Sequence, residues 1–112
     1  MASVVGATLA AAVEKDGRDP VVLDVRGVVD SFDALVVLSG RNDRQVRAIA
    51  EEVERLGALA GVSPLRVEGM AEGEWVAIDY GDVIVHVFSA AQRAFYNLEQ
   101  LWSAATPIVR LQ

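Results

Sequence analysis

The chain of 112 residues contains no cysteine and one histidine, His86. Without thiols it can form no disulfide, no cysteine-ligated zinc site and no cysteine nucleophile. A transition-metal site would then need carboxylates beside His86, and we expect neither a metal nor any other cofactor. Because His86 lies within a valine-rich segment, a neutral histidine that is hydrogen-bonded beside a sheet is favoured over a ligand or a catalytic base.

Clusters of basic residues and long apolar runs are also missing. Lys and Arg number 10 against 16 Asp and Glu, a net charge of -6. Since the basic residues are dispersed along the sequence, we expect no direct sequence-specific contact with nucleic acid. No apolar run approaches the roughly 20 residues that cross a bilayer, and the apolar start lacks the basic residues of a signal peptide. We therefore expect a cytoplasmic protein without a membrane partner, whose acidic surface serves either solubility or a basic protein partner.

What the sequence does contain is a series of short elements separated by Gly, Pro and Asp. The order α-β-β-α-β-β-β-α has adjacent β-β connections, so its sheet cannot be all parallel. We predict one α/β (α+β-like) domain over residues 1–112, with a core over 4–103, a short tail over 104–112, and a single mixed sheet of about five strands flanked by helices. The predicted helices and strands cover residues 4–15, 21–26, 34–38, 42–60, 65–68, 74–80 and 82–88, followed by a helix from 89.

Local signals specify how two of the helices begin. Asn42 with Gln45 predicts a capping box at the start of the second helix, and Ser89 with Gln92 predicts another at the start of the last helix. The first helix is predicted to bury one apolar stripe, formed by Val5, Leu9, Ala12 and Val13.

Signals for catalysis are weak. Ser39-Gly40 precedes a helix, where exposed amides could hold a phosphate, but this is also the ordinary construction of a strand-to-helix turn. We expect no catalytic residues, and a small nucleotidyltransferase-like enzyme remains the alternative. Two pairs of carboxylates resemble metal ligands but are more typical of turns, namely Asp30 with Asp33 and Asp79 with Asp82.

The predicted hairpin over residues 74–88 combines large rings with carboxylates. Alternation in a strand puts Trp75 on the same face as Asp79, and Tyr80 on the opposite face with Ile78. Aromatic side chains among charges are typical of an interface that receives Arg and Lys from a partner. Trp75 favours this interpretation, whereas core and interface are equally good interpretations of Tyr80. The carboxylates near these rings are Glu72, Glu74, Asp79 and Asp82.

Several segments, in order along the chain, resemble the ribosomal silencing factors of the RsfS/Iojap family. The resemblance covers residues 21 to 102, most of the chain. One departure from the family pattern is the turn at Asp30–Ala34. After Ser-Phe, family members commonly have Thr-Asp and then an aromatic residue, whereas here Phe32 is followed directly by Asp33 and then by Ala34. The matching segments are 21–27, 31–40, 44–50, 68–69, 73–75, 79–82, 85–88 and 93–99.

This resemblance implies a function. Family members bind the large ribosomal subunit through protein uL14, block joining of the small subunit and repress translation under starvation. Their fold is similar to that of nucleotidyltransferases, without the catalytic carboxylates, and they often form homodimers. A dimeric interaction module with another partner is a further alternative. With the neighbouring Glu74, the implied contact surface comprises Trp75, Ile78, Asp79, Tyr80 and Asp82.

Overall fold

The protein folds into a sheet with helices on both sides, in a computed structural model that describes residues 2–96 and 106–110. The predicted order of elements is confirmed, and one strand follows it. The elements are α1 (Ala2–Glu14), β1 (Arg18–Asp24), β2 (Ala34–Gly40), α2 (Asp43–Leu59), β3 (Arg66–Glu68), β4 (Trp75–Asp79), β5 (Val83–Ser89), α3 (Ala90–Tyr96) and β6 (Thr106–Arg110).

The strands form a mixed sheet in the order β3-β4-β5-β2-β1-β6. β2 and β5 are parallel, and the other neighbouring pairs are antiparallel. The sheet thus has one strand more than the five expected, because Thr106–Arg110 lies in the segment predicted to be a tail and pairs instead with β1. Pro107 does not prevent this pairing, since a strand at the edge of a sheet tolerates a residue without an N–H group.

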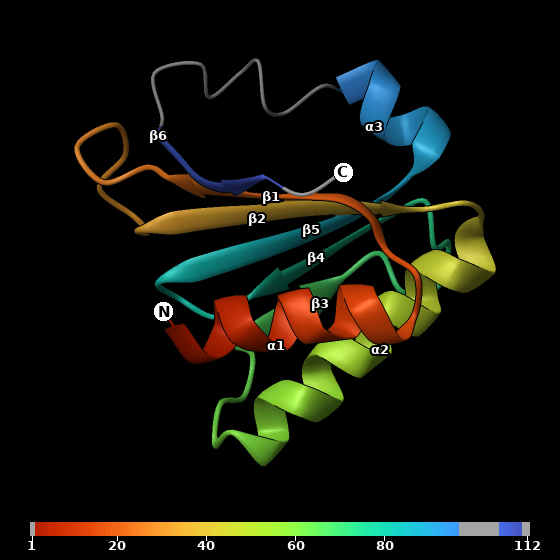
Figure 1. Cartoon of the computed structure of the whole chain (residues 1–112), viewed down its shortest axis with the longest axis horizontal. Coiled ribbons are helices and arrows are strands. Elements are labelled where there is room, and N and C mark those ends of the chain that lie inside the picture. Colours follow the sequence, from red (N-terminus) through yellow and green to blue (C-terminus); the bar gives the residue numbers. More distant parts are fainter. Residues whose placement is uncertain (1, 97–105, 111–112) are drawn as a thin grey trace.

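The two faces of the sheet have different cover. Figure 1 shows α1 and α2 together on one side and α3 on the other. Every residue of β2 is buried, as expected for a central strand covered on both faces. Among the described residues, none of the helices has the length and apolarity required to cross a bilayer. The core between the sheet and α2 includes Val36, Leu38, Ile49, Val53, Ile78, Val85 and Val87.

The buried stripe of α1 differs from the predicted one. Val13 is 84% exposed, so its assignment to the buried face is wrong. The buried face starts at Val4 and continues at three- and four-residue spacing through Ala7 and Ala11. Thr8 shares this face because its hydroxyl donates to the carbonyl oxygen of Val4 at 2.8 Å, which satisfies a buried polar group.

The capping signal at the start of α2 is confirmed and also joins the two long helices. The side chain of Asn42 accepts the N–H of Gln45 at 2.8 Å. The side chain of Gln45 accepts the N–H of Arg41 and donates to the carbonyl oxygens of Lys15 and Asp16 at 3.0 and 3.1 Å. One residue therefore satisfies backbone groups at the start of α2 and at the end of α1.

Candidate functional site

Strand β4 separates the predicted contact residues onto two faces. Its register pairs Trp75 with Phe88, Ala77 with His86 and Asp79 with Ile84. These pairs lie on the face opposite α1 and α2, as the predicted alternation requires. The other face of β4 belongs to the core beneath α2.

Ile78 and Tyr80 lie on the core face, so the structure separates them from the other predicted contact residues. Ile78 is 0% exposed and Tyr80 8%. The ring of Tyr80 reaches Gly57 of α2, where an added Cβ atom would lie 3.2 Å from the tyrosine hydroxyl. Burial raises the pKa of Tyr80. Both side chains therefore contribute mainly to the core beneath α2.

Trp75 lies on the open face and is held by its neighbours on β5. Its indole Nε1–H donates to Nδ1 of His86 at 2.9 Å. The ring stacks on Phe88 with centroids 5.0 Å apart and an interplanar angle of 26°. Gly69 (φ 91°) allows the preceding loop to pass, because a Cβ atom there would collide with the carbonyl oxygen of Trp75. The orientation of the Trp75 ring is thus set by His86 and Phe88.

His86 is a neutral, hydrogen-bonded histidine, as its place in the sequence predicts. Burial lowers the pKa of His86 to about 4, so the ring is uncharged at neutral pH. The pairing with Trp75 explains why an imidazole is tolerated beside the sheet: its buried nitrogen has a donor. From the sequence, His86 and Trp75 were interpreted separately. The register of β4 and β5, which brings the two rings together, could not be predicted from the sequence.

A shallow, open pocket of about 200 Å³ lies beside His86 on this face. At its rim, Arg66 lies 3.9 Å from the carboxylate of Glu68 and 3.7 Å from that of Asp79. Arg66 and Glu68 are exposed and Asp79 is partly buried, so these ion pairs contribute little to stability and the charges of Arg66 and Glu68 are accessible to a partner. The pocket is lined by Arg66, Glu68, Ala77, Asp79, Ile84 and His86.

Backbone contacts hold the hairpin loop in place. The carboxylate of Asp79 accepts the N–H of Gly81 at 2.8 Å. This is the turn-forming role that the sequence favours for Asp79 over metal binding. The carbonyl oxygen of Asp82 accepts the N–H groups of Asp33 and Ala34 at 2.7 and 3.2 Å, so the loop also joins the turn before β2. Glu74 is exposed, and its carboxylate accepts from the side chain of Gln92 at 3.4 Å.

The Ser39-Gly40 turn is already occupied by the chain's own groups. Ser39 is buried, and its hydroxyl donates to the carbonyl oxygen of Arg18 at 3.4 Å. An added Cβ atom at Gly40 would lie 2.9 Å from the backbone nitrogen of Val46. Within residues 2–96 and 106–110, no group of three acidic or histidine side chains could hold a metal ion. The backbone N–H groups at the start of α2, where a phosphate could have been held, already have acceptors. Those of Arg41, Arg44 and Gln45 donate to the side chains of Gln45, Asp43 and Asn42, respectively.

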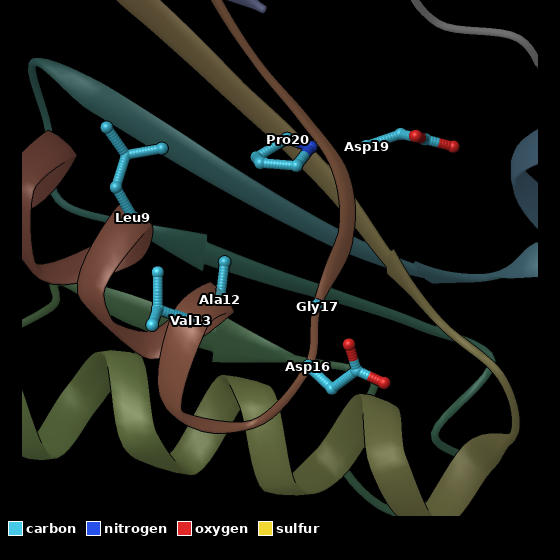
Figure 2. Close-up of a pocket in the computed structure, with 7 residues that line it drawn as sticks. All are labelled: Leu9, Ala12, Val13, Asp16, Gly17, Asp19 and Pro20. Atoms are coloured by element: carbon cyan, nitrogen blue, oxygen red, sulfur yellow. The ribbon is translucent and has the colours of Figure 1, made fainter. Parts of the chain in front are cut away.

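A second pocket lies between the end of α1 and the start of β1 (Figure 2). The side chains of Leu9 and Ala12 rise from α1 toward Pro20, whereas the carboxylates of Asp16 and Asp19 point away. Asp16 is also paired with Arg41, at 3.3 Å. This pocket therefore has a mainly apolar lining, and its two carboxylates do not converge as the polar groups that orient a ligand do.

Comparisons with known proteins agree on one family. The family described as "Ribosomal silencing factor during starvation" matches residues 2–112. A ribosomal silencing factor of Halalkalibacterium halodurans is 39% identical over 99 residues, which is 88% of this chain and 84% of that protein. The counterpart from Bacillus subtilis is 38% identical over 103 residues, 92% of this chain and 87% of that protein. These relatives carry regulatory names rather than enzyme names.

A solved structure supports the same relationship. A crystal structure of a protein from Chromobacterium violaceum is 36% identical and superimposes with a TM-score of 0.86, covering 89% of this chain and 83% of that one. The fold and the sequence therefore lead to one family.

Proposed function

The chain belongs to the ribosomal silencing factor family, and from this membership we propose that it binds the large ribosomal subunit through protein uL14. The bound protein would occupy space that the small subunit needs, and translation would fall when nutrients are scarce. This action is steric, takes place in the cytoplasm and requires no catalysis. Its strength comes from binding energy alone, which an interface of roughly 1,600 Å² supplies over a range from micromolar to picomolar affinity.

The observation that carries this proposal is the open face of β3 to β5, which combines a fixed tryptophan with an acidic pocket. Trp75 supplies a rigid aromatic surface, while Glu68 and Asp79 supply carboxylates that suit the basic groups of a ribosomal protein. Glu74 and Asp82 lie at the margins of this surface. The buried Ile78 and Tyr80, which are 0% and 8% exposed, support it from the core.

The experiment is co-sedimentation of the purified protein with purified large subunits, followed by addition of small subunits and measurement of the joined fraction. Glu68→Lys and Glu51→Lys are a matched pair, because both reverse the charge of an exposed glutamate, on β3 and on α2 respectively. We expect Glu68→Lys to weaken binding about tenfold, which corresponds to about 1.4 kcal/mol, and Glu51→Lys to change it little.

Two results would count against the proposal in different ways. Absence of wild-type binding at moderate salt would reject it outright. Equal weakening by both variants would show that net charge, rather than this face, determines binding. Cross-linking in cell extract would then identify another partner, as expected for a general interaction module. The family resemblance also predicts a homodimer, which sedimentation equilibrium of the free protein checks.

A further inference from the structure

We propose that the Nε2–H group of His86 binds an amide carbonyl of the partner, from its backbone or from an Asn or Gln side chain, and that Trp75 positions this donor. The inference rests on the proposed function and names a specific contact within its surface. It also gives Trp75 a role different from that of a simple interface anchor.

The hydrogen bond between the two rings determines which imidazole nitrogen carries the proton. An indole Nε1–H can only donate, so Nδ1 of His86, at 2.9 Å, must accept. A neutral imidazole has one N–H, which therefore lies on Nε2. The same bond fixes the ring orientation, since a flipped ring would place a carbon atom against the indole N–H. Trp75 thus sets both the tautomer and the direction of the donor.

The Nε2 atom remains available to a partner. His86 lines the open pocket on the sheet face. It makes no second hydrogen bond with the groups that the structure describes. Among the side chains of residues 2–94, Tyr80 Oη is the one buried polar atom without a partner, so Nε2 is not a buried orphan. A donor that is accessible, oriented and unused at the wall of a pocket is a recognition group.

The charges around the pocket select a neutral acceptor. Arg66 and Glu68 from β3 and Asp79 from β4 line the pocket beside His86, which gives two carboxylates against one guanidinium. A partner carboxylate would meet repulsion there. An amide suits the site, because its oxygen accepts from Nε2–H while its N–H group can donate to a carboxylate at the rim. Burial supports this arrangement by lowering the pKa of His86 to about 4, so the ring donates without a charge that would repel a basic partner.

The need for an indole N–H explains why tryptophan differs from phenylalanine at position 75. A phenylalanine ring could still stack on Phe88 but would offer nothing to Nδ1 of His86. Trp75→Phe therefore separates the positioning role from the packing role. His86→Gln keeps an N–H donor near the pocket, whereas His86→Met fills similar space without one.

The test combines two measurements on the full chain. Nitrogen-15 NMR of the His86 ring in the free protein reports the tautomer, and titration with purified large subunits reports Kd. We expect the wild type to carry its proton on Nε2, and Trp75→Phe to show a mixture of tautomers with binding a few-fold weaker. His86→Met should weaken binding about tenfold, and His86→Gln should retain most of the affinity.

The outcomes distinguish this contact from the proposed function. A wild-type proton on Nδ1 would overturn the inference even if the variants failed to fold. Wild-type binding together with unchanged affinity of a folded His86→Met would overturn the contact and leave the proposed function standing. If His86→Gln were as weak as His86→Met, shape rather than the N–H group would be responsible, and the donor role would be rejected. A wild type that ignored large subunits would remove the proposed function and this contact together.

Discussion

The two faces of strand β4 differ in what covers them. Ile78 on one face contacts the core under α2 and has no exposed surface, whereas Asp79 beside it lies at the rim of an open pocket. On the first face, side chains contribute to stability through apolar burial. On the second, they contribute accessible charges and an oriented donor. Adjacent residues of β4 thus serve different purposes, one in the stability of the fold and the other in binding. Substitutions on the two faces should therefore affect stability and binding separately.

The largest effect is expected from Ile78→Ala. Truncation of a fully buried isoleucine removes apolar contacts and leaves a cavity, so the free energy of unfolding should fall by about 2–5 kcal/mol. Urea denaturation followed by circular dichroism measures this value. Binding of the fraction that remains folded should be unchanged. A loss below 1 kcal/mol would mean that this face is not the closed core described above.

Acidification should weaken the fold through His86, the one histidine of the chain. Its pKa is about 4 in the folded protein and about 6.5 when unfolded, so the unfolded chain binds the proton more tightly. The stabilisation is complete above pH 6.5 and is lost as the pH falls from 6.5 toward 4, by up to about 3 kcal/mol. Urea midpoints across this range measure the loss. His86→Gln should abolish this part of the dependence, and an unchanged profile in that variant would assign it to other groups.

Tyr80→Phe should stabilise the protein by up to about 1 kcal/mol. The buried hydroxyl of Tyr80 has no hydrogen-bond partner among the described residues, and its removal relieves that desolvation while the ring stays in place. Thermal unfolding measures the change, and co-sedimentation with large subunits should show unaltered binding. Weaker binding of this variant would restore Tyr80 to the contact surface from which its burial excludes it.

The smallest effect on stability is expected from Asp79→Asn. The amide oxygen of asparagine can still accept the N–H of Gly81, and the ion pair that is lost is a 3.7 Å contact with the exposed Arg66. The free energy of unfolding should change by less than about 0.5 kcal/mol, while affinity for large subunits should fall because a rim carboxylate is lost. A destabilisation comparable to that of Ile78→Ala would contradict the distinction between the two faces.

Features fixed by local sequence could be predicted, and features fixed by distant contacts could not. The hairpin at Gly81 and the cap at Asn42 depend on neighbouring residues, and both are confirmed. The burial of Tyr80 depends on Gly57, more than twenty positions away, so strand alternation predicted its face but left core and interface as equal alternatives. The pairing of Trp75 with His86 likewise requires the register of two strands. The segment around Pro107 is predicted to be a tail but forms an edge strand. Proline is tolerated in a strand only at certain places, such as a sheet edge, and the local sequence does not show where a strand will lie in the sheet.

The position of β6 has a consequence for the order in which the fold is completed. Synthesis proceeds from the N-terminus, so β1 is made long before the strand that covers its outer side. Until Thr106–Arg110 arrives, the valine-rich β1 presents unpaired N–H and C=O groups, the kind of edge on which another chain can add a strand. β6 therefore covers an edge that would otherwise be open to pairing with another chain.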